Sequence, residues 1–167
     1  SASKYSLMHS AAHFEYKCDY DIKNITIDGY DLYDYVFAYP AANKLCEADI
    51  AILLRDFINA KSGYFLDVIP NNEITSQTGR VIYLSAEQKE NAIVPYEYGV
   101  ALFGDSSYSL SLTAAKFIDD IKKNLKDGAV DIDYGKAVEV ERVDTSFEAM
   151  FCFAKENEQK PIGPLES

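Results

Sequence analysis

Two long stretches of the chain carry hydrophobic residues at helical spacing. Residues 42–62 place apolar side chains on one face, with Lys61 in the last turn and Gly63 as a left-handed cap. Residues 112–125 repeat the pattern, and Gly128 ends it. The predicted inward-facing residues are Cys46, Ile50, Leu53, Leu54, Phe57, Ile58, Ala114, Phe117, Ile118, Ile121 and Leu125. The pattern therefore predicts two amphipathic helices.

A third helix and several strands are predicted from shorter patterns. Residues 145–148 have the spacing of a capping box, and the apolar residues within 147–154 predict a short helix behind it. Runs typical of strands occur at residues 13–18, 25–27, 35–39, 64–69, 80–84 and 94–103, the last as a hairpin or two strands. Asp28-Gly29 predicts a tight turn, and residues 104–109 form a polar loop. A further hairpin is predicted at residues 129–143, around Tyr134-Gly135.

The order of these elements predicts the fold class and the domain organisation. Strands interspersed with helices indicate an α/β (α+β) sandwich, in which one mixed β-sheet packs against two to three helices. The 167 residues, 48% of them hydrophobic, are enough for one domain with its own core. We expect a single α/β domain over residues 1–157, with its core at 25–128 and a C-terminal hairpin and helix at 129–157. Residues 158–167 are predicted to be a polar tail.

The charge balance excludes some classes of partner. The chain has 16 Lys and Arg against 27 Asp and Glu, a formal net charge of −11. This field repels phosphate backbones and anionic lipid headgroups, so nucleic acid and acidic membrane surfaces are not expected partners. No window approaches the roughly 18 apolar residues of a membrane span, and residues 1–17 lack the basic start and apolar run of a signal peptide. A membrane span is therefore not predicted.

Neither a disulfide framework nor a cofactor motif is visible. Cys18, Cys46 and Cys152 are odd in number and widely spaced; the last two are interpreted as core residues, and a pairing of Cys18 stays open. Residues 131–135 (DIDYG) resemble part of a calcium loop without its later glutamate, so an acidic hairpin is the favoured interpretation. No glycine-rich phosphate-binding motif occurs. We expect no metal and no cofactor.

Residues 103–106 (FGDS) suggest a nucleophile. They resemble the serine block of the GDS(L) lipases and esterases, which would make Ser106 a catalytic serine with Asp105 beside it. A hydrolase serine needs a base, and the two histidines, His9 and His13, both lie near the amino end, without the adjacent glutamate of a zinc protease. In the other interpretation, the segment is a turn between a strand and a helix. This interpretation is favoured, no catalytic residue is assigned, and a small serine hydrolase that uses Ser106 is kept as the alternative.

Tyrosine is abundant, with 13 copies, while tryptophan is absent. A tyrosine ring offers a flat apolar face on which a sugar can stack. The candidate ligand-binding residues are Tyr30, Tyr33, Tyr35, Tyr39, Tyr96 and Tyr98. The same residues suit half-buried strands, and in sequence a stacking tyrosine and a strand tyrosine look alike.

The run from Ile25 to Leu125 also resembles a known domain. Residues 61–68 (KSGYFLDV) match a helix ending, residues 81–85 (VIYLS) match a short strand, and residues 100–104 with 114–118 match a strand, loop and helix. Together they look like the α/β domain that precedes the catalytic barrel in glycoside hydrolases such as family 20 β-hexosaminidases and α-glucuronidases. Many uncharacterised secreted bacterial proteins are similar to it.

This resemblance implies an accessory role. In those enzymes the barrel supplies the catalytic acid and the sugar pocket, and 167 residues are too few for a barrel of about 250 residues. The resemblance implies a non-catalytic accessory domain of a secreted bacterial carbohydrate-active protein, extracellular or at the cell surface. Its expected partners are a glycan or a neighbouring catalytic domain. A structural or protein-interaction module, binding through a sheet edge or the third helix, is the remaining alternative.

Overall fold

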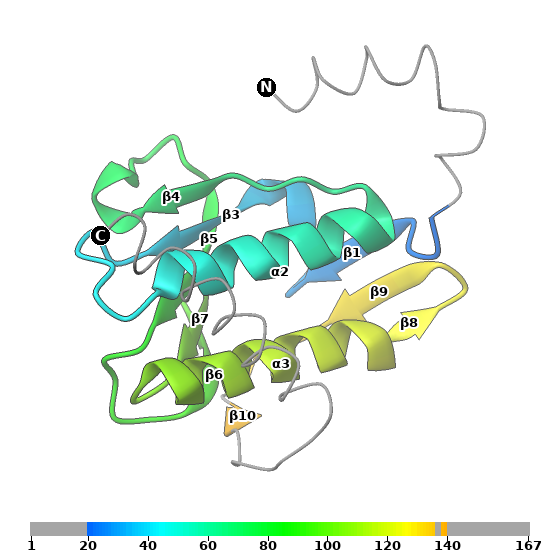
Figure 1. The fold of residues 1–167 in the computed structure, drawn as a ribbon. Coiled ribbons are helices and arrows are strands. Elements are labelled where there is room, and N and C mark those ends of the chain that lie inside the picture. Colours follow the sequence, from blue (N-terminus) through cyan, green and yellow to red (C-terminus); the bar gives the residue numbers. More distant parts are fainter. Residues whose placement is uncertain (1–19, 136–137, 140–167) are drawn as a thin grey trace, which may run out of the picture.

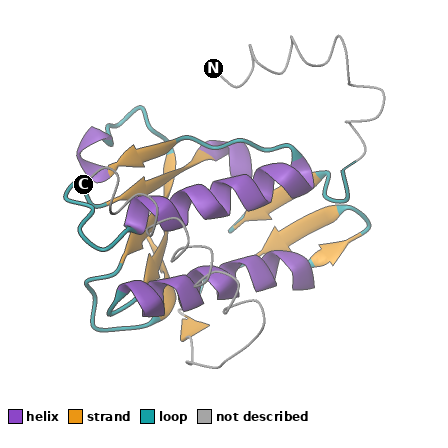
Figure 2. Cartoon of the chain, in the orientation of Figure 1, coloured by secondary structure: helices purple, strands orange, loops and turns teal. Residues whose placement is uncertain are grey.

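Two sheets and two long helices make up the part of the chain that the computed structural model describes, residues 20–135 and 138–139 (Figures 1 and 2). The helices are α2 (Glu47–Ser62) and α3 (Ser107–Lys123), with short 3-10 turns η1 (Leu32–Asp34) and η2 (Asn71–Glu73). The strands are β1 (Asn24–Ile27), β2 (Tyr30–Asp31), β3 (Tyr35–Tyr39), β4 (Val68–Pro70), β5 (Arg80–Ser85), β6 (Ala92–Tyr96), β7 (Gly99–Phe103), β8 (Leu125–Lys126), β9 (Ala129–Ile132) and β10 (Val138–Glu139). The α/β sandwich predicted from the sequence is confirmed. The strand predicted at 13–18 and the third helix lie outside the described residues.

The larger sheet is mixed and has the order β10-β6-β7-β5-β3-β4. Strands β4, β3, β5 and β7 run parallel, while β6 and β10 are antiparallel additions at one edge. Parallel neighbours need a crossover connection, and α2 supplies it between β3 and β4. In Figure 1 both helices lie on the same side of this sheet.

The smaller sheet corrects the prediction of one sheet. Its order is β2-β1-β9-β8, and its central pair, β1 with β9, is parallel and aligns Asn24 with Ala129 and Ile27 with Ile132. Helix α3 leads the chain from β7 in the large sheet to β8 and β9 in the small one. Residues from the two ends of the described chain thus form one sheet.

The predicted hairpin around Tyr134-Gly135 is wrong. Strand β9 pairs with β8 before it, and β10 pairs with β6 of the other sheet. The turn that makes the observed hairpin is Asp127-Gly128, where φ is 54° and 82°, the left-handed values that a tight hairpin turn requires. Gly128 therefore closes a hairpin and does not end the helix. The turn predicted at Asp28-Gly29 has the same geometry and is confirmed, with φ of 53° and 85°.

The helix boundaries differ from those predicted from the hydrophobic periodicity. Helix α2 begins at Glu47, because Cys46 takes a left-handed backbone (φ 62°) at the N-cap. Cys46 therefore precedes the helix and is half-buried, where a core position within the helix was predicted. Helix α3 begins at Ser107, five residues before the predicted start, because Ser106 caps it. It ends before Leu125, which lies in β8 and is 38% exposed. Gly63 forms the predicted left-handed cap (φ 83°). Of the strand predicted at residues 64–69, only residues 68 and 69 pair, in β4, which extends to Pro70.

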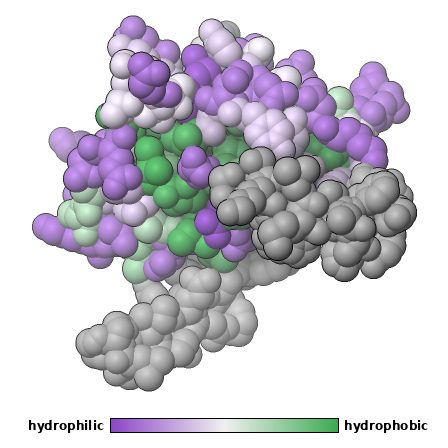
Figure 3. Space-filling model, turned by 90° about the horizontal axis from the view of Figure 1, so that it is seen from above, coloured by the Kyte–Doolittle hydropathy of each residue, from purple (hydrophilic) through white to green (hydrophobic). Residues whose placement is uncertain are grey.

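The core lies between the helices and one face of the sheets. Ile50, Leu54 and Ile58 of α2 and Phe117, Ile118 and Ile121 of α3 are buried as predicted. They form one cluster with sheet residues that include Ile82 and Leu84 of β5. Figure 3 shows that apolar residues also reach the surface, in a patch among hydrophilic residues.

The other face of the large sheet is apolar as well. Side chains alternate along a strand, so Val81 and Tyr83 lie on the face opposite Ile82 and Leu84. Register places Ala38 and Ala101 beside Tyr83. Val81, Ala38 and Ala101 are buried, yet they are not members of the core cluster, and Tyr83 is half-buried. We call this face, with Val36, Ala38, Ile69, Val81, Tyr83, Val94, Ala101 and Phe103, the outer face.

No helix of the described residues is long and apolar enough to cross a membrane.

Candidate functional site

Ser106 is the N-cap of α3. Its Oγ accepts a hydrogen bond from the Ser109 amide at 3.1 Å and donates one to Ser109 Oγ at 3.1 Å. Ser109 Oγ in turn donates to Asp105 Oδ1 at 2.6 Å. The Ser106 hydroxyl thus accepts a hydrogen bond from one of the backbone amides in the first turn of the helix, which have no acceptor within the helix. The described residues contain no histidine, since His9 and His13 lie outside them.

Gly104 has a packing role in this segment. A Cβ atom built on it would lie 2.4 Å from the Leu110 amide nitrogen and 2.7 Å from Leu110 Cα. Only glycine allows the strand end to pass this close to the first turn of α3. The observed glycine and serine of the FGDS segment therefore serve a tight strand-to-helix connection, which is the interpretation that the sequence favoured.

The six candidate tyrosines do not form one platform. Tyr35 is buried, with 2% of its surface exposed, and Tyr39 ends β3 at the opposite end of the strand. Tyr33 is exposed and stacks on Tyr64, with ring centroids 4.2 Å apart. The exposed members are Tyr30, Tyr33, Tyr96 and Tyr98, at 47%, 65%, 39% and 61%. Because register places Tyr96 beside Gly99, whose neighbour on β5 is Val81, Tyr96 extends the outer face.

Tyr30 and Tyr35 share a charged neighbour, Arg80. The Arg80 guanidinium carbon lies 3.9 Å from the Tyr30 ring centroid and 5.3 Å from that of Tyr35. Arg80 Nε also donates to the Tyr35 hydroxyl at 3.1 Å, and this hydroxyl donates to the Ile27 carbonyl at 2.8 Å. Tyr35 begins β3 and Arg80 begins β5, in direct register, while Tyr30 follows the turn after β1. The cluster therefore joins the two sheets.

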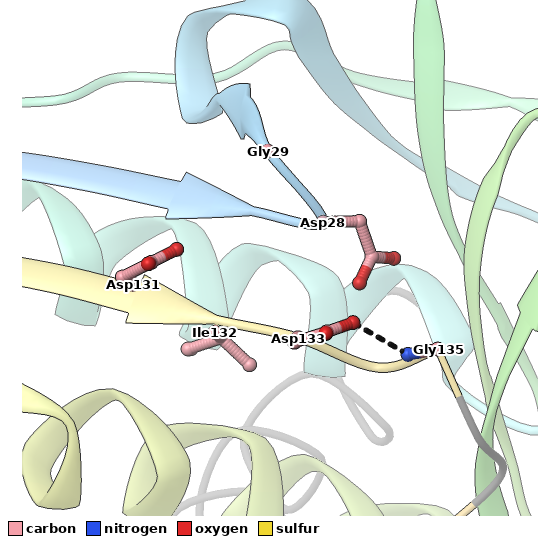
Figure 4. A pocket seen from close by; sticks show the side chains of 6 residues that line it. All are labelled: Asp28, Gly29, Asp131, Ile132, Asp133 and Gly135. Carbon is pink, nitrogen blue, oxygen red and sulfur yellow. Dashed lines mark hydrogen bonds between the residues drawn. The ribbon is translucent and has the colours of Figure 1, made fainter.

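A pocket of 380 Å³ opens beside this cluster, at the carboxyl ends of the parallel strands β1 and β9. Its lining residues are Asp28, Gly29, Asp131, Ile132, Asp133 and Gly135 (Figure 4). Figure 4 shows the carboxylates of Asp28 and Asp133 close together, with Asp131 farther back along β9. Tyr30 is the residue after Gly29 of the pocket lining, and the charge of Arg80, which stacks on the Tyr30 ring, acts on the Asp28 carboxylate of the pocket.

Backbone contacts fix the pocket walls. Asp28 Oδ1 accepts the Tyr134 amide at 2.6 Å, and the Asp28 amide donates to the Ile132 carbonyl at 2.8 Å. Asp133 Oδ1 accepts the Gly135 amide at 2.8 Å. Burial is the main cause that raises the pKa of Asp28 above its ordinary value; the Tyr134 amide opposes the rise, and the nearby Asp133 adds to it. The pocket therefore concentrates carboxylate acceptors in a partly desolvated place.

Tyr134 anchors the pocket to α3. Its hydroxyl donates to Asp120 Oδ2 at 2.6 Å, and Lys116 pairs with the other Asp120 oxygen. Burial, together with the Asp120 charge, raises the pKa of Tyr134 far above that of a free phenol. The ring is thus a neutral donor that connects the helix to the small sheet.

Sequence reasoning did not find Arg80 or Asp28 as parts of a site. Arg80 looked like the polar start of a strand, and Asp28 like a turn residue. Both interpretations are correct locally. The proximity of Arg80 and Asp28, however, depends on strand pairing, which no local sequence pattern shows. Within the described part of the chain, no three His, Cys, Asp or Glu side chains are grouped to hold a metal ion.

A scan against protein-family models and a search of curated proteins each found no match to this chain.

Proposed function

We propose that this chain is a non-catalytic domain that binds a neutral glycan through the Tyr30 ring and the adjoining acidic pocket. One observation carries the proposal. Tyr30 is nearly half exposed, is held by Arg80 at 3.9 Å, and directly follows Gly29, which lines a pocket with three aspartates. An apolar platform beside convergent polar groups is the usual composition of a small-molecule site.

The chemistry of a sugar suits both parts. The C–H groups on one side of a pyranose ring are apolar and can stack on an aromatic face. Its hydroxyls donate hydrogen bonds, and carboxylates such as those of Asp28 and Asp133 only accept them. Charge-assisted bonds of this kind are the stronger ones.

The charge of the site supports a neutral ligand. Three carboxylates line the pocket, and the chain carries a formal charge of −11. An anionic glycan would meet like charge both at the pocket and at long range. Uronates and sulfated sugars are therefore poor candidates.

The wider setting follows from the resemblance and is part of the proposal. It is that of an accessory domain in a secreted bacterial carbohydrate-active protein, next to a catalytic domain. The small serine hydrolase is less well supported, because the Ser106 hydroxyl is engaged in the helix cap.

The test is a binding series with a matched control. Calorimetry and thermal shifts would use four neutral pentasaccharides, from cellulose, xylan, mannan and chitin, with oligogalacturonate as the anionic comparison. Tyr30→Ala is expected to lower affinity at least 10-fold, about 1.4 kcal/mol, a magnitude in the range measured for stacked rings. Tyr108→Ala removes an equally exposed ring (47% in both) from α3 and should leave affinity unchanged.

Two results would contradict the proposal. One is that none of the neutral pentasaccharides binds, and the other is that Tyr30→Ala and Tyr108→Ala bind alike. Preferential binding of oligogalacturonate would overturn the claim of a neutral ligand.

A further inference from the structure

Arg80 is held from two directions. Its guanidinium carbon lies over the Tyr30 ring at 3.9 Å and over the Tyr35 ring at 5.3 Å. In addition, its Nε donates to the Tyr35 hydroxyl at 3.1 Å. The stacking contact sets the distance of the guanidinium from the Tyr30 ring, while the hydrogen bond sets its rotation. A planar guanidinium takes up a single position and orientation only when both the stacking contact and the hydrogen bond are present.

The Tyr35 hydroxyl is well suited to impose that rotation. The Tyr35 side chain is buried, and its hydroxyl donates to the Ile27 carbonyl at 2.8 Å. The one proton of the phenol is therefore committed to Ile27, and its oxygen faces Arg80 as an acceptor. Burial raises the pKa of Tyr35, which keeps the phenol neutral and the arrangement unchanged through ordinary pH.

We propose that Tyr35 is the positioning residue of the glycan site, because it locks Arg80 over Tyr30 and so fixes the Tyr30 ring before a sugar arrives. The inference rests on the proposed function only for the identity of the ligand as a glycan. The positioning itself is a property of the free protein. Tyr35 does not touch the ligand and acts only through Arg80.

The expected effect on binding is moderate. A ring that is already ordered loses little freedom when a sugar stacks on it, whereas a mobile ring must be ordered by the ligand. Release of Arg80 should therefore weaken binding by about 2- to 10-fold, the factor that one immobilised side chain carries.

The variant is Tyr35→Phe, which keeps the ring and removes the acceptor. Tyr83→Phe is the matched control, because it removes a partly buried phenol from β5 whose hydrogen-bond partner is Asn71. Nitrogen-15 NMR of the free protein reports on Arg80 directly. In the wild type and in Tyr83→Phe, the Nε–H signal of Arg80 should be ring-shifted and protected from exchange. In Tyr35→Phe it should move to the position of a free arginine, and the Tyr30 ring signals should shift with it.

Arg80→Lys is a second variant in case Tyr35→Phe does not fold. Lysine keeps the charge but has neither the planar guanidinium nor an Nε–H. The Tyr30 ring signals should therefore shift as they do in Tyr35→Phe. The four neutral pentasaccharides then serve as binding probes for all variants.

The outcomes separate this inference from the proposed function. An Arg80 signal that stays protected in Tyr35→Phe would overturn the inference, whether or not a sugar binds. A wild type that binds none of the pentasaccharides, with Arg80 released in Tyr35→Phe, would sustain the positioning and refute the glycan. Release of Arg80 with unchanged affinity for a bound pentasaccharide would overturn the functional role of Tyr35.

Discussion

Asp28 combines a backbone role with a chemical one. Its φ of 53° places it in the left-handed region that the turn after β1 needs. Its side chain accepts the Tyr134 amide and lies beside Asp133 in the pocket. The same residue thus shapes the turn, ties β1 to the end of β9 and supplies a carboxylate acceptor.

Asp28→Asn is expected to stabilise the protein at neutral pH. Asparagine tolerates the left-handed backbone and keeps the Oδ1 acceptor, while the partly buried charge is removed. The gain should be below about 1 kcal/mol, the size of a screened surface interaction. Because burial raises the pKa of Asp28 above 3.8, the folded state favours the neutral acid. The stability that protonation provides is complete below the unfolded pKa and is lost as pH rises through the folded pKa.

The advantage of Asp28→Asn should therefore be present at pH 7 and absent near pH 3. Urea unfolding at both pH values measures it. Asp131→Asn is the control, since it removes the same charge from an exposed position on β9. Equal gains from the two variants, or a loss from Asp28→Asn, would show that burial at Asp28 is not the cause.

At the scale of elements, helix boundaries depend on caps that interrupt the hydrophobic period. The buried positions Ile50, Leu54 and Ile58 could be predicted because they recur every three to four residues. The starts of α2 and α3 could not, because a left-handed Cys46 and a capping Ser106 decide them. Ser106 lies inside the polar run 104–109, which was predicted to be a loop.

Ser106 permits a test that separates capping from catalysis. Ser106→Ala should lower the free energy of unfolding by about 1 kcal/mol, the typical contribution of an N-cap. Ser106→Asn keeps an oxygen that can accept the Ser109 amide and should retain most of that stability, although it has no nucleophile. Denaturant unfolding, together with hydrolysis of p-nitrophenyl acetate and butyrate, measures both properties. An esterase activity that both substitutions abolish would restore the hydrolase hypothesis.

At the scale of the whole molecule, strand pairing places the site. The α/β sandwich and the core were predictable from the order of the elements and the hydrophobic period, but the division into two sheets was not. Strand β1 pairs with β9, and Thr26 is 105 positions from its partner Asp131. Local propensities carry no information on such a pairing, so the proximity of Tyr30, Arg80 and the acidic pocket had no sequence signal.

The two faces of the large sheet should differ sharply in their tolerance of polar groups. Ile93 and Val94 are neighbours on β6, but Ile93 is fully buried in the core cluster and Val94 lies half-buried on the outer face. Ile93→Thr should cost about 2 to 4 kcal/mol, through lost packing and a buried hydroxyl. Val94→Thr should cost less than about 1 kcal/mol. Chemical denaturation measures both, and equal costs would mean that the outer face is as enclosed as the core.

The parallel pairing of β1 with β9 has a consequence for how the chain is made. Of the described strands, β1 and β2 are synthesised first, and β1 then has only β2 as a neighbour until Ala129–Ile132 of β9 has been added. A two-stranded hairpin alone is marginally stable in water. The small sheet, and with it the pocket beside Asp28, is thus completed only after both helices and every strand of the large sheet except β10 have been made. A ribosome that stalls before Ile132, or a protease that cuts there, would leave a chain with the helix-covered strands β3 to β7 of the large sheet and without the acidic pocket.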